Sequence, residues 1–151
     1  MLDKKNIKIF KTKLGNFYLQ TKKQYIIFLL PTCKMATKSL NPYHKAIHLQ
    51  IKAYLENKIK NLNFPCLPEG SRFQKIVWYE IKKIGYGKKK SYLEISKKIK
   101  SSPRAVGKAC STNPCLFFIP CHRVICNNGS IGGYIMGTRI KKQLLINEFK
   151  L

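Results

Sequence analysis

The chain has 151 residues and a formal charge of +24, because 30 lysine and arginine residues outnumber 6 aspartate and glutamate residues. Hydrophobic residues make up 44% of the sequence, which is enough to bury a core and argues against a wholly disordered chain. The charge does not come from a basic tail, since residues 1–65 carry +11 and residues 66–151 carry +13. Such a field favours a polyanionic partner, nucleic acid before an anionic membrane surface; the alternative is a solvated lysine-rich surface from a compositionally biased genome.

The sequence also limits where the protein works. No apolar signal segment follows the first residues, and the longest apolar run, residues 25–30, is too short to cross a bilayer. We therefore expect an intracellular protein, cytoplasmic or, in a eukaryote, nuclear, whose six cysteines remain thiols. No Cys-x-x-Cys pair occurs and only three histidines are present, so we expect no metal site.

The first half of the chain predicts a small α/β domain. Three segments of alternating or continuous apolar residues predict strands of an antiparallel sheet, and apolar residues at helical spacing then predict a helix. A segment with two prolines follows at residues 61–70 and predicts a linker, so we place the domain boundary between residues 65 and 66. The strands are expected at residues 7–11, 17–20 and 25–30, the last ended by Pro31, and the helix from Asn41-Pro42 to about Lys60.

The second half, residues 66–151, predicts a mostly helical domain and hence an α+β protein. Ser71-x-x-Gln74 and Ser91-x-x-Glu94 have the form of capping boxes that start helices. Ser102-Pro103 starts another helix only two or three residues after the second one, which indicates a helix-turn-helix; plain helix packing is the alternative. Further expectations are an apolar stripe of Phe73, Ile76, Val77, Ile81 and Ile84, a buried strand at 116–119, a glycine-rich loop at 129–137 and a last helix at 139–149.

A cysteine with a histidine beside it follows the expected buried strand. In Pro120-Cys121-His122-Arg123-Val124, both His122 and Arg123 can favour the reactive thiolate of Cys121. Adjacent residues of an extended chain face opposite sides, so we expect His122 to reach Cys121 through a bend or a bridging water. The alternative is an inert buried thiol, which is how we interpret the other five cysteines.

The last helix offers a partner for that histidine. Ile140, Leu144, Leu145 and Glu148 fall on one predicted helix face, which places a carboxylate in line with apolar residues. A buried carboxylate needs a partner, and a histidine N–H would let it orient the ring and stabilise the imidazolium. This gives a nucleophile, a base and an orienting group; the alternative is a frayed terminal glutamate in solvent.

From Phe73 to Glu148 the chain resembles the O6-alkylguanine-DNA alkyltransferases (methylated-DNA–protein-cysteine methyltransferases). The resemblance covers about half of the chain, and the first half matches only in outline. The stretches that carry it are Phe73-x-x-x-Val77-Trp78, Ser91-Tyr92, Arg104-Ala105-Val106-Gly107-x-Ala109, Asn113-Pro114, Ile119-Pro120-Cys121-His122-Arg123-Val124, Gly129, Gly133-Tyr134 and Leu144-Leu145-x-x-Glu148.

The resemblance implies a DNA repair protein that acts as a monomer, once per molecule and without a cofactor. Such a protein binds duplex DNA in the minor groove by its helix-turn-helix and flips O6-alkylguanine, mainly O6-methylguanine, into a pocket. Cys121 takes the alkyl group irreversibly, while His122, held by Glu148, accepts the thiol proton through water. Arg104 fills the gap in the base stack, Tyr92 crowds the flipped phosphate and donates to guanine N3, and Asn113 ties the turn around the cysteine.

The resemblance also implies further contacts with DNA and with the flipped base. Ser91, Ala105 and Gly107 join Arg104 and Tyr92 in contacting DNA. Met136 adds bulk where the family pattern Gly-Tyr-Ser-x-Gly-Leu is replaced by Gly133 to Thr138, so we expect methyl to be handled better than benzyl-type groups. The pocket residues are expected to be Pro120, Val124, Tyr134, Ile135 and Met136.

Two other functions remain as alternatives. One is a non-catalytic, alkyltransferase-like protein that binds lesions through its helix-turn-helix; the presence of Cys121, His122 and Glu148 counts against it. The other is a cysteine hydrolase or redox protein, which needs an oxyanion hole or a resolving cysteine, and no Cys-x-x-Cys pair occurs.

Overall fold

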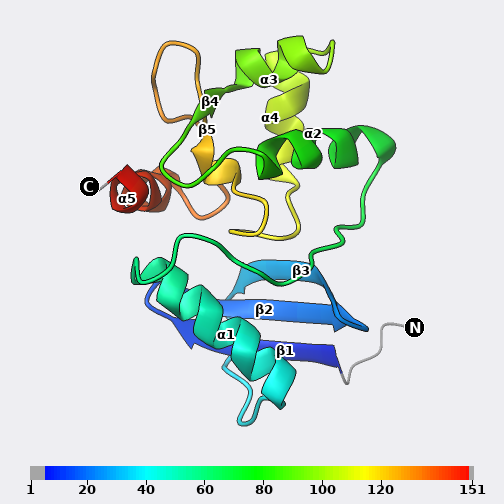
Figure 1. The fold of residues 1–151 in the computed structure, drawn as a ribbon, viewed down its shortest axis with the longest axis vertical. Helices are drawn as coiled ribbons and strands as arrows, with labels where there is room; N and C mark the ends of the chain where they lie inside the picture. The colour runs from blue at the N-terminus through cyan, green and yellow to red at the C-terminus, as the bar shows by residue number, and fades with distance from the viewer. Residues whose placement is uncertain (1–5, 150–151) are drawn as a thin grey trace. The chain divides into compact units, whose positions relative to one another are not determined.

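Three antiparallel strands and one helix make up the first part of the chain, as the sequence predicts. The strands pair in the order β1-β2-β3, and α1 lies across one face of the sheet (Figure 1). The fully buried side chains of this unit are apolar residues of the sheet and of α1, among them Phe17, Leu19, Leu29, Ile47 and Ile51. In this computed structural model, which describes residues 6–149, the elements are β1 (Ile7–Thr12), β2 (Gly15–Lys22), β3 (Tyr25–Thr32) and α1 (Pro42–Leu55).

Helix α1 begins as expected and ends five residues early. The side chain of Asn41 accepts a hydrogen bond from the backbone N–H of His44 at 2.8 Å, which caps the helix before Pro42. At the other end Asn57 has φ +60°, and the N–H groups of Asn57 and Lys58 donate back to the carbonyls of Tyr54 and Ala53. This left-handed turn closes the helix after Leu55 and corrects the expected end near residue 60.

The segment expected as a linker belongs in part to the first unit. The N–H of Ile26 donates to the carbonyl of Pro65, and the N–H of Leu67 donates to the carbonyl of Ile26, both at 2.9 Å. The outer edge of β3 is therefore paired at this point, and the boundary between the two units falls between Glu69 and Gly70. Pro31 lies inside β3 and does not end it, which an edge strand tolerates because it needs fewer N–H donors.

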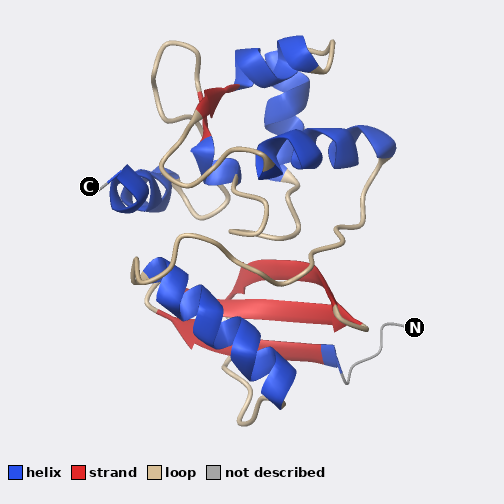
Figure 2. Ribbon diagram, viewed as in Figure 1, coloured by secondary structure: helices blue, strands red, loops and turns tan. Residues whose placement is uncertain are grey.

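The second unit is mostly helical, again as predicted (Figure 2). Both capping boxes are present: Ser71 with Gln74 and Ser91 with Glu94 exchange side-chain and backbone hydrogen bonds. Helices α3 and α4 pack together as a helix-turn-helix, and α2 packs on both. The elements are α2 (Arg72–Lys82), β4 (Lys90–Ser91), α3 (Tyr92–Lys98), α4 (Pro103–Ser111), β5 (Val124–Ile125), which pairs parallel with β4, and α5 (Thr138–Phe149).

Two apolar patterns in this unit differ from the prediction. On α2, the side chains of Phe73 and Ile76 are 37% and 43% exposed. The buried face of the helix contains Trp78 instead, and its Nε1–H donates to the carbonyl of Ala109 at 2.9 Å. Residues 116–119 are buried but form no strand. The chain folds back within them, because Phe117 has φ +67° and Leu116 bridges to Ile119. Four apolar residues in a row fit a buried strand and a buried turn equally well.

Candidate active site

The buried turn before Cys121 is held by one side chain, that of Asn113. Its Oδ1 accepts from the backbone N–H of Cys115 at 2.9 Å, and its Nδ2 donates to the carbonyl of Ile119 at 2.8 Å. The same Nδ2 lies 3.0 Å from Cys121 Sγ, so the amide that fixes the turn also donates to the sulfur. A short 3₁₀ turn, Cys121–Arg123, follows directly, so the backbone bends at these residues. That His122 reaches Cys121 through such a bend or through a bridging water stays a prediction.

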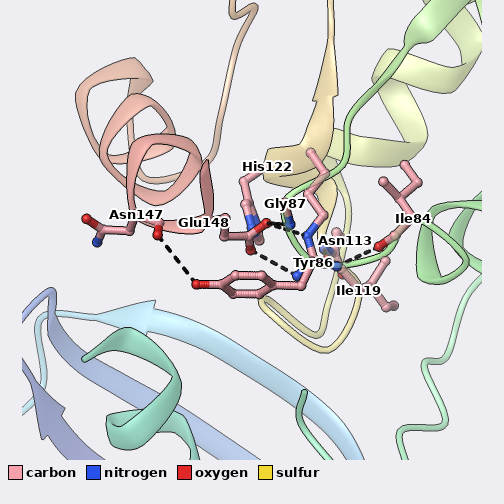
Figure 3. Close-up of polar contacts among 9 residues, drawn as sticks. Ile84, Tyr86, Gly87, Asn113, Ile119, His122, Asn147 and Glu148 are labelled. Atoms are coloured by element: carbon pink, nitrogen blue, oxygen red, sulfur yellow. Dashed lines mark hydrogen bonds and ion pairs between the residues drawn. The ribbon is translucent and has the colours of Figure 1, made fainter. Parts of the chain in front are cut away.

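The carboxylate of Glu148 gathers three partners inside the unit. His122 Nε2 lies 2.7 Å from Glu148 Oε1, so the hydrogen bond expected between these two side chains is present. The guanidinium of Arg123 donates two hydrogen bonds to the same carboxylate, from Nε to Oε2 at 2.8 Å and from Nη2 to Oε1 at 2.9 Å. The N–H of Gly87 donates to Oε2 at 3.3 Å (Figure 3). Glu148 is thus a buried, fully hydrogen-bonded anion, and not a frayed end.

These contacts decide the protonation form of His122. Burial lowers the pKa of His122, while the hydrogen bond and charge of Glu148 oppose that shift and Arg123 adds to it. The ring is therefore neutral near pH 7. A carboxylate only accepts hydrogen bonds, so Nε2 carries the ring proton and Nδ1 carries the lone pair. This is the form that a general base requires.

The thiol of Cys121 is nearly enclosed, at 4% exposure. Burial raises the pKa of Cys121, and the groups that lower it are the amide of Asn113, the ammonium of Lys141 and backbone N–H groups. The sequence predicted that His122 and Arg123 favour the thiolate of Cys121. In the structure, Arg123 is directed to Glu148 and to the carbonyl of Ile84 instead.

Cys121 lies in the wall of a cavity of about 740 Å³. That volume is in the range of small-molecule binding sites. Tyr92, Arg104 and Gly107 of the helix-turn-helix line one part of the wall, and residues 132–135 of the glycine-rich loop line another. Gly132 has φ +71°, and a Cβ atom there would lie 3.2 Å from the ring of Tyr92, so glycine allows the loop to approach that ring.

The cavity does not include every residue expected in it. Tyr134 and Ile135 line it, whereas Pro120, Val124 and Met136 are not among the described residues that do. Pro120 and Val124 are buried beside the cysteine turn. Without Met136 in the wall, the structure offers no support for the expected bulk at that point. The cavity wall therefore gives no steric reason at Met136 for a preference for methyl over benzyl-type groups.

The residues expected to contact DNA lie on α3 and α4 or cap them. Arg104 is exposed and reaches the cavity from the first turn of α4, and Gly107 follows one turn later. Ala105 is half-buried, and its N–H donates to the Ser102 side chain at the helix start. Ser91 is buried and caps α3 through the N–H of Glu94, so its side chain is engaged within the protein.

Sequence reasoning missed three side chains at the cavity. Cys110 and Cys126 line it with Cys121, and burial raises the pKa of Cys110 to about 12. Lys141 is fully buried near the same wall. The available signal was helical spacing, since Lys141 lies three residues before Leu144 and seven before Glu148. Those three residues form the buried face of α5, whereas Ile140 and Leu145 are only half-buried.

Two absences hold for the described part of the chain. Within residues 6–149, no group of three or more histidine, cysteine or acidic side chains is placed to hold a metal ion. Over the same range, no helix is both long and apolar enough to cross a membrane.

Fold and site together define a class: a helix-turn-helix unit whose cavity holds a cysteine next to a buried histidine–glutamate pair. The sequence signature described as "6-O-methylguanine DNA methyltransferase, DNA binding domain" matches residues 72–150. A methylated-DNA–protein-cysteine methyltransferase of Sulfolobus acidocaldarius is 35% identical over 139 residues, which are 91% of this chain and 88% of that protein. The chain therefore belongs to the 6-O-methylguanine DNA methyltransferase family.

Two further comparisons agree with this assignment. A methylated-DNA–protein-cysteine methyltransferase of Methanosarcina acetivorans is 44% identical over 98 residues, which are 64% of this chain and 63% of that protein. The match thus spans less than two thirds of that relative. The crystal structure of Mycobacterium tuberculosis OGT in complex with DNA has a TM-score of 0.83 and 28% identity, and covers 95% of this chain and 92% of that chain.

Proposed function

We propose that this protein repairs DNA by transferring the alkyl group of O6-alkylguanine, above all O6-methylguanine, to its own Cys121, once per molecule. One observation carries the proposal: the sulfur of Cys121 lies in the wall of a cavity that the helix-turn-helix also lines, through Tyr92 and Arg104. A nucleophile in that position meets a nucleobase only if the base leaves the duplex and enters the cavity. The substrate would be double-stranded DNA, which places the protein in the cytoplasm or nucleus.

The surface charge supports a DNA partner of any sequence. Residues 66–151 carry +13, and contacts to phosphates are the same for every base pair. We expect affinity for duplex DNA to fall steeply as salt rises, with little sequence preference. Arg104, exposed at the start of α4 and reaching the cavity, is suited to fill the gap left by a flipped base.

The transfer itself is a direct displacement. Cys121 Sγ attacks the alkyl carbon, a sulfur–carbon bond forms, and the bond from that carbon to guanine O6 breaks. The thiol proton passes through a water molecule to His122, which then returns it to solvent. Burial raises the pKa of Tyr92, so its hydroxyl keeps its hydrogen and can donate a hydrogen bond to guanine N3, while the leaving guanine takes up from solvent the proton that His122 releases. The thioether product is not readily reversed, so each molecule acts once.

Intact mass after mixing with a duplex that contains O6-methylguanine tests this proposal. The protein should gain the mass of one methylene, and the peptide that contains Cys121 should carry it. Cys121→Ser should show no gain. Cys126→Ser removes a different thiol from the same cavity and serves as the matched control. This variant should still gain the methylene. Unchanged mass with retained affinity for the lesion would instead identify a non-catalytic lesion-binding protein.

The role of Arg104 has a test of its own. Arg104→Ala should slow transfer from duplex DNA far more than transfer from free O6-methylguanine base, since only the duplex has a gap to fill. Lys108→Ala removes an exposed cation of the same helix that does not line the cavity, so it should weaken DNA binding without that difference. If Arg104→Ala slows both reactions alike, Arg104 does not displace the base.

A further inference from the structure

A second cavity, of about 310 Å³, lies in the first unit, and the reaction proposed above does not use it. A water molecule takes up about 30 Å³ in the liquid, so the cavity has room for a phosphate group. Among the described residues, every one that lines it has a polar side chain and none has a carboxylate. The first turn of α1 and the turn between β2 and β3 supply most of its wall, through Asn41, Tyr43, His44, Lys23 and Gln24.

One ring nitrogen of His44 is buried in this wall without a partner. The residue is 1% exposed, and its Nε2 lies 2.9 Å from Oγ1 of Thr21, which lines the same cavity. Within residues 6–149, Nδ1 forms no hydrogen bond. Helical side chains lean toward the N-terminus of their helix, so the ring leans toward the first turn of α1, at the cavity. A buried polar atom without a partner is costly, and its position therefore indicates that a ligand binds next to it.

The groups near that nitrogen are hydrogen-bond donors. Pro42 has no N–H, and the N–H of His44 donates to Oδ1 of its cap, Asn41. Over the described range, the N–H of Tyr43 is left without a protein acceptor, at the positive end of the helix dipole. Lys23, whose backbone has φ +54° in the β2–β3 turn, adds an ammonium to the same wall. A helix N-terminus with an adjacent cation favours an anion such as phosphate.

We propose that this cavity binds a phosphate group, held by the backbone N–H of Tyr43, the ammonium of Lys23 and the Nδ1–H of His44. The Thr21 hydroxyl allows this, because it can donate to Nε2 of a neutral ring or accept from Nε2 of a charged one. In both arrangements Nδ1 carries a hydrogen. The site belongs to the first unit and does not depend on the proposed reaction at Cys121.

Nuclear magnetic resonance of the full chain tests the site. Inorganic phosphate is added at constant ionic strength, maintained with chloride, while the amide signal of Tyr43 and the ring signals of His44 are followed. The variants are Lys23→Gln and, as the matched control, Lys22→Gln. Both lysines are exposed, so neither substitution disturbs the core, and only Lys23 lines the cavity.

Both signals should move and reach saturation, and Lys23→Gln should weaken the affinity about tenfold through loss of one charge-assisted hydrogen bond. Lys22→Gln should follow the parent. Burial and the charge of Lys8 on β1 lower the pKa of His44, and bound phosphate should raise it because an anion favours the imidazolium. Signals that move without saturation, or equal losses of affinity in the two lysine variants, would show only screening of a lysine-rich surface and would overturn the proposal.

An undamaged DNA duplex, used in place of inorganic phosphate, identifies the source of the phosphate group. Movement of the same two signals by the duplex, weakened in Lys23→Gln and kept in Lys22→Gln, assigns the site to a backbone phosphate of DNA. Movement by inorganic phosphate and not by the duplex assigns it to a free anion, and movement by neither contradicts the site. Failure of methyl transfer to Cys121 would refute the proposed function and leave all of these outcomes unchanged.

Discussion

The two units of the chain bury polar groups to different extents. Among the described residues of the first unit, Thr12, Gln20, Thr21 and His44 are the buried polar side chains, and none of them is an acidic, lysine or arginine residue. The second unit buries Glu80, His122, Arg123, Lys141 and Glu148. Burying charge destabilises a fold unless each charge is paired, so the second unit is stable only while its network is complete. The difference shows which unit carries chemistry: Glu80 apart, these buried groups lie in the unit's cysteine turn or on the buried face of α5.

The largest expected effect comes from removing one member of that network. Arg123→Met leaves the buried carboxylate of Glu148 without its bidentate partner, which should destabilise the second unit by about 3–5 kcal/mol. Trp78 is the only tryptophan of the chain and lies in α2, so its fluorescence during denaturation in guanidinium reports on this unit. Arg139→Met, an exposed arginine of α5, is the control and should change little. A loss below 1 kcal/mol in Arg123→Met would mean that Glu148 does not depend on this arginine.

A smaller effect is expected where a neutral polar group holds the cysteine turn. Asn113→Ala leaves the N–H of Cys115 and the carbonyl of Ile119 without their partner, which should cost about 2–3 kcal/mol by the same fluorescence measurement. Because the amide of Asn113 lowers the pKa of Cys121, iodoacetamide labelling at neutral pH should also slow. Asn127→Ala, at an exposed position of the loop, should change neither quantity. Normal labelling in a folded Asn113→Ala protein would show that the amide does not stabilise the thiolate.

Local signals in the sequence predicted most of the fold. Strand alternation, the Asn41 cap and the capping boxes at Ser71 and Ser91 each involve residues within four positions of one another. The pairing of His122 with Glu148 was also expected, although 26 residues separate them, because a carboxylate in line with an apolar helix face demands a partner. That demand is a physical constraint which holds before the fold is known.

What the sequence could not predict depends on long-range packing. Helical spacing assigned the buried face of α5 to Ile140, Leu144, Leu145 and Glu148. Lysine is rarely buried, yet Lys141 lies on that face with Leu144 and Glu148, since Gly133 and Tyr92 accept hydrogen bonds from it. Similarly, the turn at residues 116–119 depends on the contacts of Asn113 with residues up to eight positions away. Periodicity alone does not reveal either contact.

The buried histidine of the first unit, His44, gives a weaker, pH-dependent effect. Burial lowers the pKa of His44 and the charge of Lys8 adds to this. The unfolded chain therefore binds a proton below the ordinary pKa of 6.5 that the folded unit does not bind, and the unit should lose stability as pH falls below that value. The slope is at most about 1.4 kcal/mol per pH unit.

Hydrogen exchange of the β2 amides between pH 7 and pH 5, corrected for intrinsic exchange rates, measures this slope. His44→Gln should remove it, because glutamine does not titrate, and His48→Gln, at a half-buried position of the same helix, should keep it. A slope that survives in His44→Gln would assign the acid sensitivity to another group and leave the first unit without a titrating core residue.

The smallest effect is expected for substitution of Glu80. It tests whether burial of a carboxylate alone determines how much stability the second unit loses when that carboxylate is removed. Glu80 pairs with Lys83 and Lys98 at 2.6 Å, but both lysine side chains are about half exposed, so solvent screens the pairs. Glu80→Gln should therefore cost about 1 kcal/mol or less, and the loss should shrink as salt rises. The hydrogen bonds from the two lysines lower the pKa of Glu80, so its contribution is present above 4.5 and disappears as pH falls below that value. A salt-independent loss as large as that of Arg123→Met would show that burial of the carboxylate, and not enclosure of its partner, governs stability here.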